Sequence, residues 1–170
     1  TAGAAITDGT VFEAVAGVAA GAAAQALTTI TMNGNIAWGA NDNTAAATAI
    51  GATTGVTVEG ATNNAHVNIT LNAAAAGATN TIKLGNANNF ITDLTSVGKV
   101  VIEVGSGGNL IDIDQGAAST YLAEVKLGAH TNTTTVFNKI LVSDAYGQAT
   151  GYSTVITGAT KGDVIVFNNG

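Results

Sequence analysis

Short apolar segments alternate with turns rich in Gly and Asn over most of the chain. From Val56 onward, apolar residues recur at every second position within each segment. This alternation is typical of half-buried β-strands. We therefore predict a mostly-β fold of short strands, either β-solenoid-like or a β-sandwich. The predicted strands are Val56–Val58, Val67–Leu71, Thr81–Leu84, Val100–Val104, Leu110–Ile113, Glu124–Leu127, Thr135–Phe137, Ile140–Val142, Thr154–Thr157 and Asp163–Phe167.

The turns carry a degenerate repeat in which Gly follows one apolar strand and Asn or Asp precedes the next. The repeat glycines are Gly60, Gly85, Gly105, Gly128 and Gly158, with spacings of 25, 20, 23 and 30 residues. Asn occurs four residues after the first four glycines, at Asn64, Asn89, Asn109 and Asn132, and Asp163 occurs five residues after the last. Periods of this size indicate stacked strand–turn–strand units, which build an extended surface and not an enzyme pocket.

Charged residues in the repeat predict its register. Lys83, Glu103 and Lys126 each lie two residues before a repeat glycine. If the strands stack about 4.8 Å apart, these side chains form a column of alternating charge on the outer face. Opposite charges on neighbouring strands are mildly favourable. Side chains found on different faces would contradict the stacked arrangement.

The first part of the chain follows a different pattern. Thr10–Leu27 is rich in Ala and is the one long helix that the sequence predicts. Its apolar run is shorter than the roughly 20 residues that a membrane span requires. Thr28–Met32 and Ile36–Trp38 flank an Asn-Gly pair and predict a hairpin, followed by a loop over 41–52. We expect residues 1–50 to form a helical and hairpin assembly segment, and residues 51–170 to form the repeat-bearing domain of one continuous unit.

The composition excludes several classes of partner. The net charge is −6 and the chain contains no Arg, so it cannot neutralise a run of phosphates in nucleic acid. An anionic membrane surface is a poor partner for the same reason. Only 9% of the residues are charged, which permits dense self-association. The lack of Cys removes disulfides and thiol chemistry, and with abundant Thr, Asn, Gly and Ala it suggests an exported bacterial protein.

One turn suggests a metal. Gly105-Ser-Gly-Gly-Asn-Leu-Ile-Asp-Ile113 resembles the calcium-binding nonapeptide of type I secreted repeat proteins, but Asn109 stands where that family has a ligand Asp. Asp112 and Asp114 alternate with apolar residues and would share one face, so together with Asp93 they are candidate ligands of a weak calcium site. The alternative is that Asn caps the turns without any metal, since Asn bonds its own backbone. No cofactor is required in either case.

The resemblance to surface proteins extends over about residues 56–168. The Thr-, Asn-, Gly- and Ala-rich β segments without Cys, together with the tail Val155–Asn168, are similar to bacterial surface-layer proteins and type I secreted surface proteins. This resemblance implies an extracellular location at the cell surface. We predict no enzymatic activity, because no Ser lies in a nucleophile-elbow sequence. The two histidines, His66 and His130, are expected in turns or exposed strands and need not meet.

The sequence thus predicts an extracellular, self-assembling structural protein, either a surface-layer subunit or a filament protomer. Thr10–Leu27 or Val164–Phe167 would contact a neighbouring copy by packing or strand addition. An adhesin or carbohydrate-binding module within a larger secreted protein is the alternative, with a surface glycan as its partner. A polysaccharide-cleaving solenoid is a third class and would need carboxylates clustered in a groove.

Overall fold

All regular secondary structure in the described part of the protein is β-strand. The computed structural model describes residues 4–7, 29–33, 48–50, 55–71, 77–94, 98–115, 121–130, 136–144 and 152–168. The helix predicted at Thr10–Leu27 lies outside these residues. Within them, no helix has the length and apolar character needed to cross a membrane.

The strands form two sheets. The seven-stranded sheet, called the first sheet, contains β1 (Ala4–Thr7), β2 (Thr29–Asn33), β4 (Thr57–Gly60), β6 (Thr79–Leu84), β8 (Gly98–Val104), β10 (Tyr121–Leu127) and β12 (Tyr152–Thr157) in that order. The six-stranded second sheet contains β3 (Thr48–Ile50), β5 (Asn68–Leu71), β7 (Phe90–Asp93), β9 (Leu110–Gln115), β11 (Lys139–Asp144) and β13 (Val164–Asn168).

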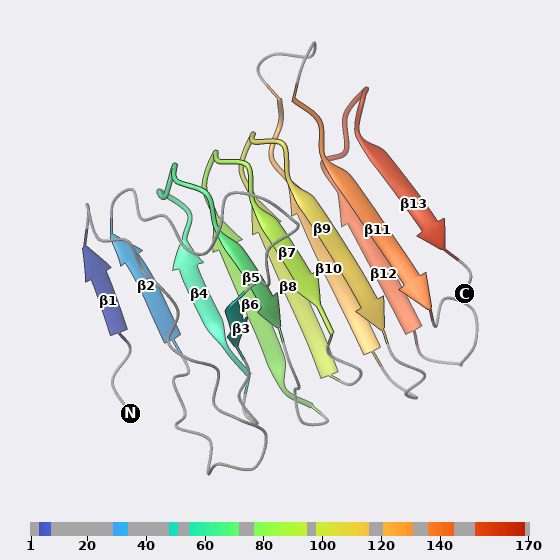
Figure 1. Ribbon diagram of the computed structural model, residues 1–170. Helices are drawn as coiled ribbons and strands as arrows, with labels where there is room; N and C mark the ends of the chain where they lie inside the picture. Colours follow the sequence, from blue (N-terminus) through green and yellow to red (C-terminus); the bar gives the residue numbers. More distant parts are fainter. Residues whose placement is uncertain are drawn as a thin grey trace.

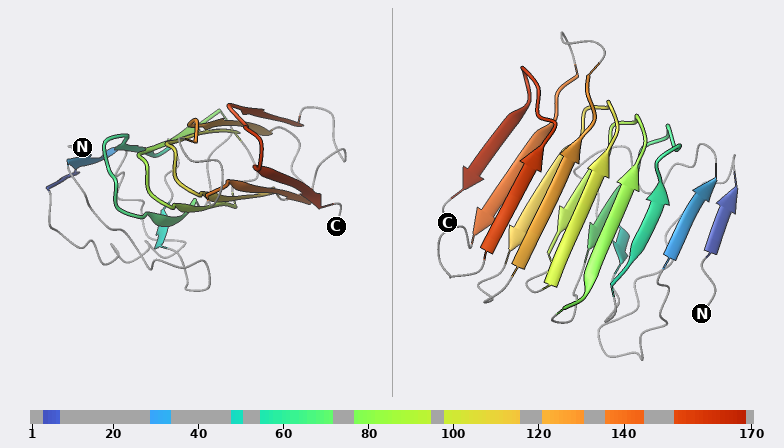
Figure 2. Two further views of the ribbon diagram at one scale, coloured as in Figure 1. Left: turned by 90° about the horizontal axis from the view of Figure 1, so that it is seen from above. Right: turned by 180° about the vertical axis from the view of Figure 1, so that it is seen from behind.

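The chain winds as a parallel β-solenoid. From β2 onward, successive strands alternate between the two sheets, and every pair of neighbouring strands is parallel. One strand of the first sheet and the next strand of the second sheet together form a rung. The two layers face each other with their strands in opposite directions (Figures 1 and 2). The solenoid prediction is therefore confirmed, whereas a sandwich would have paired its strands antiparallel within each sheet.

Columns of aliphatic side chains fill the space between the sheets. In the first sheet, Val58, Ile82, Ile102 and Val125 are in register and fully buried. In the second sheet the equivalent column is Ile69, Ile91, Ile111 and Ile140. β-Branched residues suit this position because they pack well on a pleated surface. The alternation of apolar and polar residues in the sequence corresponds to these inward-facing positions.

The charge column predicted from the sequence is confirmed. Lys83 pairs with Glu103 and Glu103 pairs with Lys126 on adjacent strands. Glu59 extends the column by one rung, and its Oε1 accepts a hydrogen bond from Lys83 Nζ at 2.9 Å. Lys126 Nζ lies 3.9 Å from Glu103 Oε2. The hydrogen bond with Glu59 and the charges of Glu59 and Glu103 raise the pKa of Lys83.

The repeat glycines stack directly at three of their five positions. Gly85, Gly105 and Gly128 stack directly, as their backbone contacts show. Gly60 instead pairs with Leu84, and Gly158 follows Thr157, the partner of Lys126, so both are displaced by one residue. Strand pairing keeps apolar columns facing inward, because a slip of one residue would turn each buried side chain outward. The one-residue displacement of Gly60 and Gly158 is accommodated in the turns and not in the strands.

Three local predictions are wrong. A hairpin cannot form at β2, because parallel strands β1 and β4 already occupy both of its edges. Burial of Met32 on the inner face accounts for the alternation that predicted a hairpin. β3 lies within the predicted loop 41–52. In the predicted strand Thr135–Phe137, the described residues Val136 and Phe137 lie in a turn that precedes β11.

Candidate functional site

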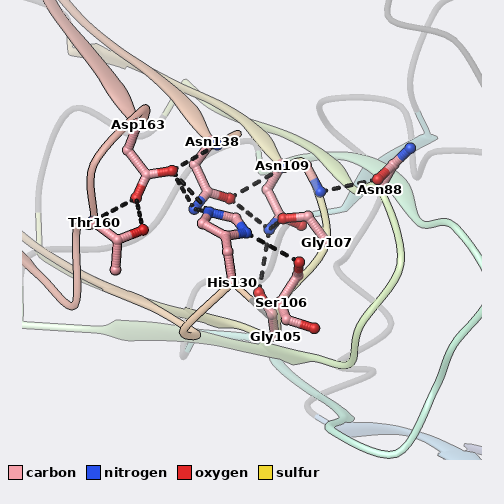
Figure 3. A network of polar contacts seen from close by, with 10 residues as sticks. Asn88, Gly105, Ser106, Gly107, Asn109, His130, Asn138, Thr160 and Asp163 are labelled. Atoms are coloured by element: carbon pink, nitrogen blue, oxygen red, sulfur yellow. Dashed lines mark hydrogen bonds and ion pairs between the residues drawn. The ribbon is translucent and has the colours of Figure 1, made fainter. Parts of the chain in front are cut away.

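A column of buried polar side chains runs along the turns that lead into the second sheet. Asn89, Asn109, Asn138 and Asp163 directly precede β7, β9, β11 and β13, and we call these four residues the polar ladder. The three asparagines are at most 1% exposed. Figure 3 shows the C-terminal part of the polar ladder. Such buried polar groups require hydrogen-bond partners, because an orphaned one is costly.

Each asparagine in the polar ladder bonds to the next. The Nδ2 of Asn89 donates to Oδ1 of Asn109 at 2.8 Å, and the Nδ2 of Asn109 donates to Oδ1 of Asn138 at 2.8 Å. The same two oxygens accept the backbone N–H of the preceding ladder residue, at 3.3 and 3.2 Å. The amides also bond the carbonyl two residues earlier, as Asn109 does with Gly107 at 2.8 Å. Successive turns therefore satisfy the hydrogen-bonding groups of one another, rung by rung.

Asp163 ends the polar ladder. Its Oδ1 accepts from the backbone N–H of Asn138 at 2.9 Å and from Asn138 Nδ2 at 3.1 Å. Its Oδ2 accepts from the backbone N–H of Thr160 at 2.7 Å and from the Thr160 hydroxyl at 3.3 Å. An ionised carboxylate suits this position because it only accepts hydrogen bonds, whereas an amide would place one NH₂ group against these donors.

Two opposing effects act on the pKa of Asp163. Burial alone would raise this pKa, but the backbone N–H groups of Thr160 and Asn138, together with His130, stabilise the carboxylate. The pKa of Asp163 is consequently lower than the ordinary value of 3.8. The carboxylate at the end of the polar ladder is therefore ionised at neutral pH.

His130 joins three turns at this end of the polar ladder. Its Nε2 lies 2.8 Å from Asp163 Oδ1, and its Nδ1 lies 3.1 Å from the backbone oxygen of Ser106. Only 2% of the His130 side chain and 1% of the Asp163 side chain are exposed. Both ring nitrogens face oxygens that accept hydrogen bonds, and Nε2 also lies 2.9 Å from Asn138 Nδ2. Phe137 packs at the ring edge, with centroids 6.4 Å apart.

The His130–Asp163 pair lacks the geometry of a nucleophile-activating pair. In a catalytic triad, the second ring nitrogen faces the hydroxyl of the nucleophile. Here Nδ1 faces the backbone carbonyl of Ser106, while the Ser106 hydroxyl donates to Asn86 Oδ1 at 3.2 Å. The cluster therefore links the turns after β8 and β10 to the turn before β13, and leaves no ring nitrogen for proton transfer to Ser106.

Two of the candidate calcium ligands, Asp93 and Asp112, lie on different faces of the second sheet. Asp93 pairs with Ile113, continues the inward column and is fully buried. Asp112 is partly exposed and alternates with buried Ile111 and Ile113, so it lies on the outer face of the second sheet. Asp114 belongs to β9, and its side chain lies outside the described residues. Over the described ranges, no cluster of three His, Cys, Asp or Glu side chains could hold a metal ion.

Counting from the repeat glycines identified only part of the polar ladder. Asn89, Asn109 and Asp163 belong to it, whereas Asn64 is exposed in its turn and Asn132 lies outside the described residues. Asn138 was missed because the turn between β10 and β11 is longer than the turns between β6 and β7, β8 and β9, and β12 and β13. A better signal is an Asn or Asp immediately before the second strand, which marks β7, β9, β11 and β13. That position is fixed by strand pairing and not by turn length.

The buried His130 was also not anticipated, because the sequence gives no sign that it meets Asp163, which lies 33 residues later. The site combines a repeated amide column with one buried contact between His130 and Asp163, and both belong to the architecture of the solenoid. Comparison of the chain with protein-family models, with curated proteins and with solved structures finds no match. The function must therefore be argued from the geometry of the solenoid itself.

Proposed function

We propose that the protein is an extracellular structural protein that assembles with copies of itself through strand contacts at the rung formed by β12 and β13. The observation that carries this proposal is the exposure of core positions on that rung. Ile165 pairs with Ile140, and Phe167 pairs with Val142, so both continue inward columns. Yet Ile165 is 38% exposed and Phe167 is 55% exposed.

The interior rungs show what would cover this surface. Ile140 and Val142 are at most 1% exposed, because β9 and β13 lie on their two sides. β13 has a neighbour on one side only among the described strands. A strand pair stacked on β12 and β13 would bury Ile165 and Phe167 in the same way. Burial of apolar area at about 25 cal/mol per Å² favours such stacking.

The edge strands also lack features that discourage pairing. Natural monomers protect sheet edges with charged side chains, Pro or bulges. Tyr152–Thr157 and Val164–Asn168 contain no charged residue and no Pro. The columns that carry Lys126 and Lys139 continue into Thr157 and Val164 at this rung. The charged columns therefore stop one rung before the edge.

A second copy of this chain is the occupant that we propose for the edge. It offers strands of the same parallel spacing, and the edge strands Tyr152–Thr157 and Val164–Asn168 place no charged side chain at the contact. Few charged residues over the whole chain also reduce repulsion between copies. The cell-surface location is supported by the absence of Cys and by the resemblance to secreted surface proteins. The proposal assigns no catalytic role and needs no calcium.

Electron microscopy and sedimentation velocity of the purified protein test this proposal. We expect fibres, sheets or defined oligomers for the natural sequence, and mainly monomers for Val166→Lys, which adds a charge to the outer face of the edge strand. Thr92→Lys is the matched control, because Thr92 belongs to the same outer column on an interior strand. It should assemble like the natural protein.

Two results would count against self-assembly. One is dispersed monomers of the natural protein at every concentration, and the other is equal assembly of the Val166→Lys variant. Dispersed particles that bind glycans would instead favour an adhesin or carbohydrate-binding module.

A further inference from the structure

We infer that the copy which covers the edge of β12 presents the opposite end of its own solenoid, so that β12 pairs in parallel with β1 of the next copy. This head-to-tail arrangement rests on the proposed function and names the partner surface. Figure 1 shows β1 and β12 at opposite ends of the stack. Each has one neighbour among the described strands of the first sheet, β2 for β1 and β10 for β12. Both therefore offer an open edge of the same sheet.

The two ends of the first sheet carry no charged residue in their strands. Charge is confined to the central strands of one register column, at Glu59, Lys83, Glu103 and Lys126. The column continues into Thr31 and Ala5 at one end and into Thr157 at the other. The sequences of β1, β2 and β12 contain no charged residue. Both ends thus lack the charges with which natural monomers protect an open edge.

The open backbone groups of the two edges are complementary. Lys99 donates its backbone N–H to the oxygen of Ala78, which is 2.9 Å away and one residue before its register partner. Alternate residues of a parallel strand bond to opposite neighbours. By register, Ala5 belongs to the same alternate set as Lys99, so its N–H is directed to the open side of β1. With Ala5 opposite Thr157 of another copy, this N–H would donate to the oxygen of Ile156.

The direction of the strands also suits a copy placed in line. Every strand pair of the first sheet is parallel, so β1 of such a copy would run in the same direction as β12. A twofold axis that joined identical ends would place β12 against either β12 or β13 of the second copy. Both of these pairings are antiparallel, because the two sheets run in opposite directions (Figures 1 and 2). Head-to-tail pairing alone extends the parallel ladder.

The spacing along the chain is that of one turn of the solenoid at this end as well. Ala5 and Thr31 are 26 residues apart, and later neighbours in the same column are 20 to 31 residues apart. β1 of a second copy would therefore follow β12 as one more turn of the same repeat.

Disulfide cross-linking tests this pairing, because the chain contains no Cys. We mix an Ala5→Cys variant with a Thr157→Cys variant and add oxidised glutathione. A covalent dimer that joins positions 5 and 157 is the expected product, since paired strands bring their Cα atoms within about 5 Å, a distance that a disulfide spans. Mass spectrometry of the linked peptides identifies the joined positions.

Ala5→Cys mixed with Lys126→Cys is the matched control. Lys126 is the register partner of Thr157 one strand further in, so it would lie about 9.6 Å from Ala5 of the next copy. A disulfide cannot span that distance, and we expect a yield at least about tenfold lower. The inference is refuted if this control is linked as strongly, or if Thr157→Cys alone gives the main covalent dimer.

Sedimentation of the natural protein and of the same variants without oxidant separates this inference from the proposed function. Assembly without a link between positions 5 and 157 would overturn the head-to-tail arrangement and leave self-assembly standing. Monomers of the natural protein at every concentration would overturn both.

Discussion

At the scale of single residues, the polar ladder makes a buried column of amides compatible with an apolar interior. Asn109 accepts two hydrogen bonds from Asn89 and donates to Gly107 and Asn138. If the side chain were removed, the buried backbone N–H of Asn89 would lose this acceptor, whereas Asn138 Oδ1 would keep the backbone N–H of Asn109. The free-energy cost of an orphaned buried group exceeds the gain from a typical hydrogen bond. Stability should therefore depend more on ladder positions than on exposed asparagines of the same turns.

Asn109→Ala is expected to lower the free energy of unfolding by about 3 kcal/mol, because it removes the acceptor Oδ1 from the buried backbone N–H and side-chain amide of Asn89. Urea unfolding measures this change. Asn88→Ala is the control: Asn88 is exposed and accepts one hydrogen bond from Gly108 N–H at 2.9 Å. Water can replace that contact, so we expect a change of about 0.5 kcal/mol or less. Equal costs at the two positions would contradict the importance of the polar ladder.

Asp163 should make the protein sensitive to acid. Its pKa in the folded state is lower than the ordinary value of 3.8. The ionised carboxylate therefore contributes stability that is fully present above its unfolded pKa and is lost as pH falls through the folded pKa. Urea midpoints measured from about pH 5 down to about pH 2 should decrease less steeply in Asp163→Asn than in the natural protein.

Asp112→Asn provides the comparison for this acid titration, because Asp112 lies on the outer face of the second sheet. We expect it to keep most of the acid dependence. A steep loss of stability in Asp163→Asn, parallel to that of the natural protein, would show that other carboxylates dominate.

At the scale of strands and turns, close stacking of the turns explains why Gly recurs in the sequence. A Cβ added to Gly107 would overlap the backbone oxygen of Ala87 in the neighbouring turn. A Cβ added to Gly108 would lie 3.1 Å from Val136 Cγ1, a side-chain atom. Backbone cannot move without disturbing the strands, whereas a side chain can shift. Adjacent glycines of one turn therefore have different tolerances.

Gly107→Ala is expected to destabilise the protein by about 3 kcal/mol, as severe overpacking does, and Gly108→Ala by about 1 kcal/mol. Thermal or urea unfolding of the two variants gives the comparison. A smaller effect at Gly107 than at Gly108 would mean that the turns are not stacked as closely as described.

The pairing of the strands was largely predictable from the sequence, but the contacts between turn residues were not. The alternation of apolar residues and the series Lys83, Glu103 and Lys126 predicted the inward columns and the register of three rungs. Both signals arise from the strict two-residue period of a strand. Turns have no such period, so counting from Gly128 selected Asn132 and missed Asn138. The contact of His130 with Asp163 depends on stacking of separate turns, which no local pattern encodes.

At the scale of the whole molecule, each rung contacts mainly its two neighbours, so the solenoid is nearly one-dimensional. Among the described strands, only those at the two ends of each sheet have a neighbour on one side alone. The interior rungs carry the charge column and the asparagines of the polar ladder, while the last rung carries Asp163 in its turn and no charged residue in its strands. Assembly through this end would depend on apolar burial, with long-range charge acting only as a weak opposing force.

Salt is accordingly expected to promote assembly. The net charge of −6 makes copies repel each other, and raising ionic strength from about 0.05 M to about 0.5 M screens this repulsion. Sedimentation velocity should show larger species at the higher salt concentration. Dissociation by salt would instead indicate that ion pairs hold the copies together, and would argue against an apolar interface at β12 and β13.

The direction of the amides in the polar ladder gives the solenoid an electrical polarity. Asn89, Asn109 and Asn138 all donate towards the C-terminal rung, so their side-chain dipoles add head to tail. The carboxylate of Asp163 lies at the positive end of this row, as an anion does at the N-terminus of a helix. Copies stacked in line would align their rows, whereas copies joined through identical ends would oppose them. The polar ladder therefore favours a polar filament over a symmetric pair.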